Sequence, residues 1–244
     1  MSKPLIIAHR GAMGTAPENT AASFEKAIAE GADGVELDVH LSKDGHLVVI
    51  HDESIDRTSN GKGMVKDMTL EELRRYDFGS YFDEAYAGER ILTLEEALEI
   101  IRECKLINIE IKNGPIFYEG IEEKVLKVIR DFDIASRVII SSFNHYTINK
   151  ISKLQPEISC GILYMEGLFK PWEYARNVGA QALHPYYFAI TPDEIGRCRE
   201  NGVKVNVWGA NDEFFIRGLI EAGVDGIITD YPGKALALRT STAG

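Results

Sequence analysis

Gly31-Ala32-Asp33-Gly34-Val35 is a junction that the chain repeats almost unchanged as Gly223-Val224-Asp225-Gly226-Ile227. In each copy a glycine stands where a helical pattern stops, and an apolar run typical of a buried strand follows. Gly179-Ala180 and Gly202-Val203 are shorter examples of the same junction. We interpret this repeat as structural and not as a binding motif.

Apolar runs typical of strands recur along the whole chain. Most are continuously apolar instead of alternating, which is expected when a parallel sheet is buried on both faces. The runs are Leu5 to His9, Val35 to Leu41, Leu106 to Ile111, Val138 to Ser141, Ser159 to Tyr164, Ala180 to His184, Val203 to Trp208 and Gly226 to Thr229.

Helical patterns lie between most of these runs. Several begin with a threonine followed three residues later by a glutamate, which is the signature of a capping box. These pairs are Thr69 with Glu72, Thr93 with Glu96 and Thr191 with Glu194. About eight strand-helix units without a linker match an α/β fold of the (β/α)8 TIM-barrel type better than a doubly wound sheet. We therefore predict a single domain over residues 1–244.

One segment, about residues 53–90, interrupts the repeat. It is too long for a loop between a strand and a helix. We predict a small insertion between the second strand unit and the following helix, with aromatic residues that pack on the barrel rim. An aromatic lip that touches lipid or substrate is the alternative. The aromatic residues are Tyr76, Phe78, Tyr81, Phe82 and Tyr86.

The composition argues against several classes of partner. The formal charge is -11, from 38 acidic and 27 basic residues, which disfavours nucleic acid and anionic membranes. The apolar stretch in Met1 to Ala8 is too short for a secretory signal, and no run is long enough to span a membrane. We predict a cytoplasmic protein without stable membrane association, in which Cys104, Cys160 and Cys198 are reduced, packed thiols.

Carboxylates gather near the ends of two predicted strands. Side chains two apart on a strand point to the same face, so Glu36 projects with Asp38, and Glu110 projects with Lys112. In a barrel this end of the strands is the catalytic face. Three carboxylates there repel one another unless they are neutralised, and hard oxygen ligands suit Mg²⁺ or Ca²⁺, with Mn²⁺ as an alternative. The pattern favours a site for one divalent metal ion.

Two histidines and two cations complete the set of reactive side chains. His9 ends the first apolar run and His51 ends Leu47 to Ile50, so both could lie over one rim as a base and an acid. Arg10 offers a bidentate fork for phosphate oxygens, and Lys112 supplies a point charge. Salt bridges to the carboxylates are the structural alternative for both cations, and they are compatible with substrate binding.

Seven short motifs follow one another in a fixed order along most of the chain: His9-Arg10-Gly11, Pro17-Glu18-Asn19-Thr20, Glu36-Leu37-Asp38-Val39, Lys43-Asp44-Gly45, Val48-Val49-Ile50-His51-Asp52, Glu110-Ile111-Lys112 and Thr229-Asp230-Tyr231-Pro232. In their order and spacing, these motifs resemble the glycerophosphodiester phosphodiesterase family. The resemblance implies a metal-dependent barrel that cleaves small diesters, such as glycerophosphocholine or glycerophosphoethanolamine, into glycerol 3-phosphate and an alcohol.

The resemblance also implies roles for individual residues. It makes Glu36, Asp38 and Glu110 the metal ligands. It makes His9 and His51 the acid and base, and Arg10 and Lys112 the phosphate contacts. The remaining implied positions are Glu18 and Asn19 as supporting or helix-capping residues, Asp52 as the group that orients its neighbour, Trp208 in the pocket wall, and Phe143, Tyr164 and His184 as weaker candidates for the glycerol wall.

One motif departs from the family pattern. The family often has Trp-Thr-x-Asn after the seventh strand, whereas this chain has Trp208-Gly209-Ala210-Asn211. A substrate contact through that threonine is therefore in question.

The expected mechanism uses both histidines. One deprotonates the glycerol 2-hydroxyl, which attacks phosphorus, while the other protonates the leaving alcohol; water then opens the cyclic phosphate. Direct attack by a metal-bound water is the competing route.

The rival functions are a phospholipase acting on lysophospholipid or phosphoinositide headgroups, a metal-dependent lyase or isomerase, and a non-enzymatic binding barrel. The preferred alcohol, the physiological metal, the assignment of acid and base, and the oligomeric state stay open.

Overall fold

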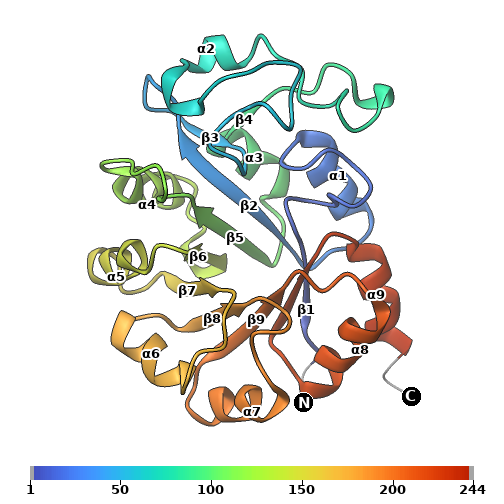
Figure 1. The fold of residues 1–244 in the computed structure, drawn as a ribbon, viewed down its shortest axis with the longest axis vertical. Helices are drawn as coiled ribbons and strands as arrows, with labels where there is room; N and C mark the ends of the chain where they lie inside the picture. Colours follow the sequence, from blue (N-terminus) through green and yellow to red (C-terminus); the bar gives the residue numbers. More distant parts are fainter. Residues whose placement is uncertain (1–2, 242–244) are drawn as a thin grey trace.

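Eight parallel strands form a closed barrel in the computed structural model, which describes residues 3–241 (Figure 1). The strand order is β1-β10-β9-β8-β7-β6-β5-β2, and β1 also pairs with β2, which closes the ring. The predicted TIM barrel is confirmed, and residues 1–2 and 242–244 of the predicted domain lie outside the description. The barrel strands are β1 (Leu5–Ala8), β2 (Gly34–Leu41), β5 (Leu106–Ile111), β6 (Val138–Ser142), β7 (Ser159–Tyr164), β8 (Ala182–Pro185), β9 (Lys204–Trp208) and β10 (Gly226–Thr229).

Helices surround the strands on the outside (Figure 1). Capping boxes form at Thr69, Thr93 and Thr191, as the sequence predicts. A large apolar core fills the space between strands and helices, and it includes the buried Cys104, Cys160 and Cys198. The outer helices are α1 (Ala21–Ala29), α3 (Leu94–Ile101), α4 (Ile121–Asp131), α5 (His145–Leu154), α6 (Pro171–Val178), α7 (Pro192–Glu200), α8 (Glu213–Ala222) and α9 (Pro232–Ser241).

The strand β2 extends beyond the barrel and carries the insertion. Its outer end pairs antiparallel with β3 (Leu47–Val49), which in turn pairs antiparallel with β4 (Leu92–Thr93). Between them lie the short helices η1 (Val65–Asp67), α2 (Leu70–Leu73) and η2 (Glu84–Tyr86). A separate small cluster of apolar side chains holds this part together, made of Val48, Ile50, Ile55, Val65, Leu73, Phe78 and Ile91.

Aromatic residues of the insertion contact the loop between β1 and α1. The Tyr81 hydroxyl accepts a hydrogen bond from the Glu18 amide (3.2 Å), and the Tyr86 hydroxyl donates to the Thr15 carbonyl (3.1 Å). Figure 1 shows the insertion beside α1. These contacts agree with rim packing, so a free aromatic lip is not needed to explain the two tyrosines. Within residues 3–241, none of the helices has the length and apolar character required to cross a bilayer.

Candidate active site

The backbone after β1 makes a sharp turn that aims Arg10 at the end of β2. Arg10 and Gly11 both have left-handed backbone conformations, with φ of 51° and 81°. A Cβ on Gly11 would lie 2.3 Å from the Ser23 hydroxyl oxygen, so glycine is required there. The turn allows the Arg10 amide to donate to the Glu36 carboxylate at 2.9 Å.

Three buried carboxylates meet at the carboxyl ends of β2 and β5. The strand register places Asp38 opposite Glu110, and Glu36 lies two residues earlier on the same face. One oxygen from each of the three residues lies within 4.8 Å of the others. Burial and the neighbouring carboxylates raise the pKa of Glu36 well above its usual range, and mainly burial raises the pKa of Glu110 to about 7. The raised pKa values show that the ionised forms of Glu36 and Glu110 are unfavourable in this cluster.

Two cations reach into the carboxylate cluster. Lys112 Nζ lies 2.6 Å from Glu110 Oε1 and 3.1 Å from Asp38 Oδ1, and Arg10 Nε lies 3.3 Å from Asp38 Oδ2. Asn19 also donates to Asp38, at 2.9 Å. Although burial disfavours a carboxylate, Lys112 and Arg10 outweigh it and hold the pKa of Asp38 well below its usual range. Asp38 is thus ionised, whereas burial destabilises the ionised forms of Glu36 and Glu110.

His9 is oriented by the last strand of the barrel. Its Nδ1 lies 2.7 Å from Asp230 Oδ1, and the other oxygen of Asp230 accepts from the Asn211 amide at 2.6 Å. Asn211 in turn accepts from the backbone amide of Asp230 at 2.9 Å. With Nδ1 held by the carboxylate, Nε2 is the nitrogen that can exchange a proton with a ligand.

His51 reaches the same site by a different route. The strand β3 runs antiparallel to β2, so it returns the chain to the barrel rim, where Ile50 donates its amide to the Asp38 carbonyl at 3.1 Å. His51 Nδ1 then lies 2.7 Å from Asp52 Oδ1. Burial, opposed by Asp38 and aided by Lys112, lowers the pKa of His51. The imidazole is consequently biased towards its neutral form.

Arg57, a residue of the insertion, links Asp52, which holds His51, to Glu18, which holds Arg10. Its guanidinium donates to both oxygens of Asp52 (2.8 and 2.9 Å) and to both oxygens of Glu18 (2.6 and 2.8 Å). Glu18 also accepts from Arg10 at 2.8 Å. Sequence reasoning missed Arg57 because the insertion has no regular pattern that would place one of its residues at the rim.

A small cavity of about 50 Å³ lies over the carboxylates. A second cavity of about 280 Å³ adjoins it and shares His51, Glu110, Lys112 and Phe143. Asp38, Glu18 and Asn19 support the residues around the small cavity from behind. The predicted residues that line the small cavity are His9, Arg10, Glu36, His51, Glu110, Lys112, Phe143 and Trp208.

Residues 9–234 match the model of the glycerophosphoryl diester phosphodiesterase family. The chain belongs to this family. Membership makes the protein a phosphoric diester hydrolase, and it agrees with a cavity flanked by two histidine-carboxylate pairs. A glycerophosphodiester phosphodiesterase from Caldanaerobacter subterraneus subsp. tengcongensis is 52% identical over 97% of this chain and 98% of its own length.

Solved structures of glycerophosphoryl diester phosphodiesterases share the fold. A phosphodiesterase from Oleispira antarctica, in complex with the product sn-glycerol-3-phosphate, is 32% identical with a TM-score of 0.86, covering 97% of this chain and 96% of that one. A glycerophosphodiester phosphodiesterase from Agrobacterium tumefaciens is 31% identical with a TM-score of 0.85, covering 96% and 99% of the two chains.

The departure at Gly209 has a local steric reason in this family member. Gly209 has a left-handed φ of 82°, and a Cβ there would lie 2.4 Å from the Tyr186 ring. Tyr186 packs against Trp208 with ring centroids 4.6 Å apart. A threonine at position 209 would clash with this ring, so the packing of Tyr186 in this chain favours glycine at that position.

Two of the weaker pocket candidates are not among the described residues that line the two cavities. Tyr164 packs in the apolar core outside the barrel, because it faces opposite to Leu163, which does line the small cavity. His184 is fully buried, and its Nε2 lies 3.1 Å from the Asn206 amide nitrogen. The sequence places both residues near strand ends, but nearness to a strand end does not determine whether a side chain reaches a cavity.

We expect His184 to make the stability of the folded phosphodiesterase fall at acid pH. Burial lowers the pKa of His184 from 6.5 to about 3, so below pH 6.5 the unfolded chain takes up a proton that the folded chain does not. The contribution of this residue to the free energy of unfolding should fall by about 2 kcal/mol between pH 7 and pH 5. Urea unfolding of the wild type and His184→Gln at both pH values measures it. Equal pH dependence in the two proteins would contradict this expectation.

Proposed function

We propose that the chain hydrolyses glycerophosphodiesters to glycerol 3-phosphate and an alcohol, with His9 and His51 as the groups that move protons. One observation carries the proposal. Two imidazoles, each held at Nδ1 by a carboxylate 2.7 Å away, line one small cavity above a carboxylate cluster. The product complex of the Oleispira antarctica relative supports glycerol 3-phosphate as the product here.

The carboxylate cluster fits a divalent cation. Glu36, Asp38 and Glu110 offer only hard oxygen atoms, which suit Mg²⁺, Ca²⁺ or Mn²⁺ better than a softer metal. The raised pKa values of Glu36 and Glu110 mean that additional positive charge would stabilise their ionised forms. When bound, the ion would act as a Lewis acid towards the phosphoryl oxygens.

Arg10 and Lys112 supply fixed positive charge at the cavity for a diester phosphate. Both line the cavity, and their contacts with the carboxylates hold them in place before the substrate arrives. Such preorganised charge stabilises the additional negative charge that develops on phosphorus oxygens in the transition state. Glu18 and Arg57 extend this support to the His51 side through Asp52.

The proton steps follow from the two oriented imidazoles. One imidazole takes the proton of the glycerol 2-hydroxyl as its oxygen bonds to phosphorus, and the other gives a proton to the alcohol oxygen as the bond to phosphorus breaks. A cyclic phosphate results. Water then adds with the two histidines in exchanged roles, and the ring opens to glycerol 3-phosphate.

The cavity beside His51 suits a polar alcohol. It is lined in part by Glu53 and Asn113, so a cationic alcohol such as choline or ethanolamine would find the Glu53 carboxylate there. The chain needs no apolar surface for substrates of this kind.

Release of glycerol 3-phosphate from purified protein tests the proposal. We expect release from glycerophosphocholine and glycerophosphoethanolamine with Mg²⁺, Ca²⁺ or Mn²⁺ present, and loss of release after chelation. A simple phosphomonoester serves as the control substrate and should not be cleaved. Undiminished release in chelator would rule out the metal role, and no release from the whole panel would rule out the function.

A further inference from the structure

The two imidazoles of the active site are supported in different ways. Asp230, which holds His9, accepts a hydrogen bond from the neutral amide of Asn211 at 2.6 Å, in the loop after β9. Asp52, which holds the other imidazole, accepts two hydrogen bonds from the Arg57 guanidinium at 2.8 and 2.9 Å. The insertion therefore supports only one of the two imidazoles.

The orientation of the Asp52 side chain depends on Arg57. Within residues 3–241, the Asp52 carboxylate has two partners, His51 Nδ1 and the Arg57 guanidinium, and the side chain is 27% exposed. The guanidinium binds both carboxylate oxygens, which fixes the plane of the carboxylate as well as its position. The same hydrogen bonds are the main reason why the pKa of Asp52 lies well below its usual range. Arg57 thus determines where Asp52 points and, through it, how the His51 ring is turned.

The other edge of the Arg57 guanidinium binds a buried carboxylate. Glu18 is 8% exposed, and it accepts from Arg57 at 2.6 and 2.8 Å and from Arg10 at 2.8 Å. A buried carboxylate is unfavourable unless a cation is paired with it. Because the Tyr81 hydroxyl holds the Glu18 amide independently at 3.2 Å, loss of Arg57 changes the charge balance of Glu18 more than its place. Arg10 alone would then balance this carboxylate and would offer less positive charge to a phosphate.

We propose that Arg57 is a positioning residue that couples proton transfer by His51 to phosphate binding by Arg10, and this inference rests on the proposed function. One guanidinium holds the carboxylate behind each of these two groups, so a single residue of the insertion sets the geometry of both. Loss of Arg57 should therefore change kcat through His51 and KM through Arg10, while the His9 side of the site is unaffected. The insertion then completes the active site in addition to packing on the barrel rim.

Arg57→Ala is the first test. We expect kcat for glycerophosphocholine to fall by on the order of 10- to 100-fold, because displacement of a reacting group by about 1 Å is enough for such a loss. We also expect KM to rise, because Arg10 is drawn towards the unbalanced charge of Glu18. In a Glu18→Gln background this charge is absent, so Arg57→Ala should no longer raise KM. A rise in KM that is the same in both backgrounds would contradict the link through Glu18.

Double-mutant cycles decide whether Arg57 acts through Asp52. Asp52→Asn and Asp230→Asn remove equivalent carboxylates, each 2.7 Å from its imidazole. In the Asp52→Asn background, Arg57→Ala should lower kcat by less than about threefold, because the contact through which it acts is already lost. In the Asp230→Asn background the full loss should remain. Equal losses in the two backgrounds would show that Arg57 only stabilises the fold and would overturn the proposal.

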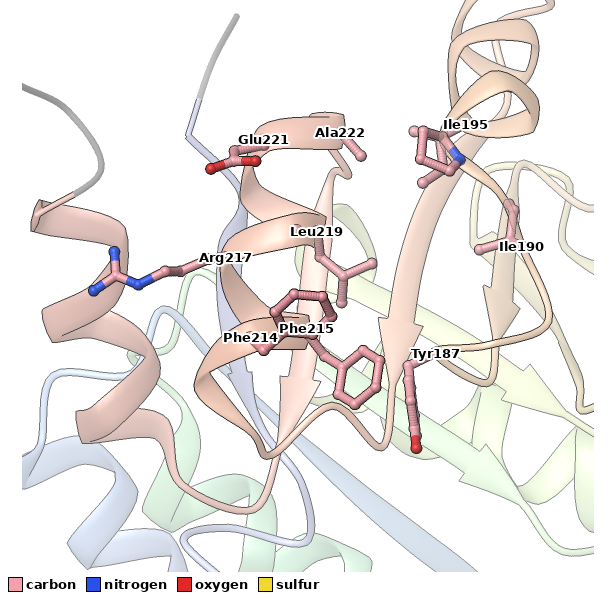
Figure 2. A pocket seen from close by; sticks show the side chains of 11 residues that line it. Tyr187, Ile190, Ile195, Phe214, Phe215, Arg217, Leu219, Glu221 and Ala222 are labelled. Carbon is pink, nitrogen blue, oxygen red and sulfur yellow. The ribbon is translucent and has the colours of Figure 1, made fainter.

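Arg217 is the matched control for the loss of a partly exposed guanidinium. Its side chain is 38% exposed, against 47% for Arg57, and it pairs with Glu213 of α8 at 2.8 Å. Figure 2 shows Arg217 on α8, at a pocket of about 430 Å³ between α7 and α8. Among the described residues, none that lines this pocket also lines either of the two cavities at the active site. Arg217→Ala should therefore keep the wild-type kcat and KM.

Nitrogen chemical shifts of the imidazoles give a readout that does not depend on turnover. A neutral imidazole whose Nδ1 faces a carboxylate carries its proton on Nδ1. At about pH 8.5, where an ordinary imidazole is neutral, the metal-free wild type should show this tautomer for both His9 and His51. Arg57→Ala should shift His51 towards the tautomer protonated at Nε2 and should leave His9 unchanged. An unchanged His51 tautomer would overturn the proposal.

The outcomes separate this proposal from the proposed function. If the wild type cleaves glycerophosphocholine and Arg57→Ala keeps its kcat, the positioning role fails and the function stands. If the wild type cleaves no diester, the function fails, and the nitrogen shifts still decide whether Arg57 positions His51. Circular dichroism verifies that each variant is folded. If Arg57→Ala is unfolded, Arg57→Lys, which keeps the charge but loses the planar fork, replaces it in every measurement with the same expectations.

Discussion

Replacing His51 by alanine should lower kcat by on the order of 10²- to 10⁴-fold, and His9→Ala should do the same, with KM changed much less. Each imidazole is held at Nδ1 by a carboxylate 2.7 Å away, so its other nitrogen is positioned for proton transfer. Losing either one leaves one of the two proton steps without a partner. Steady-state release of glycerol 3-phosphate at saturating metal measures both variants.

His46 provides the control for the histidine variants. It lies in the turn between β2 and β3, half exposed, and its only ion pair within the described residues is a 3.7 Å contact with Asp44. His46→Ala should therefore retain wild-type kcat. Near-full turnover of both His9→Ala and His51→Ala, with metal bound, would refute the acid-base assignment.

The barrel could be predicted because its strands are buried on both faces. Each of the eight predicted apolar runs overlaps a barrel strand, since continuous apolar sequence is the local trace of that environment. The insertion was visible only as an interruption. Nothing in Leu47–Val49 distinguishes a strand that folds back on β2 from a ninth barrel strand, because three residues carry too little pattern to fix a direction.

The carboxylate cluster could be predicted for a similar reason. Strand alternation puts Glu36 and Asp38 on one face, and the barrel rim brings Glu110 to them. Their hydrogen-bonding partners could not be placed in this way. Asp230 lies 221 residues from His9 in the chain, and Arg57 sits in an irregular segment, so only the folded structure brings them to the site.

Glu36→Gln should abolish most metal-dependent activity and, without metal, should raise the stability of the protein. The substitution removes one oxygen ligand with a negative charge, so we expect weaker metal binding and a loss of roughly 10²- to 10³-fold in kcat/KM, which corresponds to several kcal/mol of transition-state stabilisation. Burial and two neighbouring carboxylates raise the pKa of Glu36 well above its usual range, so its ionised form is costly in the metal-free fold. An uncharged amide of the same shape avoids that cost.

Thermal unfolding with and without divalent cation separates the two effects. The Tm of the wild type should rise with metal. The rise depends on the ratio of metal concentration to Kd, and a hundredfold excess over Kd should add about 2.7 kcal/mol to the free energy of unfolding. Glu36→Gln in chelator should have an equal or higher Tm than the wild type in chelator, with little further rise on adding metal. Glu122→Gln is the matched control, because Glu122 is also buried but is paired with Lys150 at 3.0 Å, away from the cluster. Its metal-induced rise should equal that of the wild type. A Glu36→Gln protein that keeps the full rise and full activity would show that Glu36 does not bind the metal.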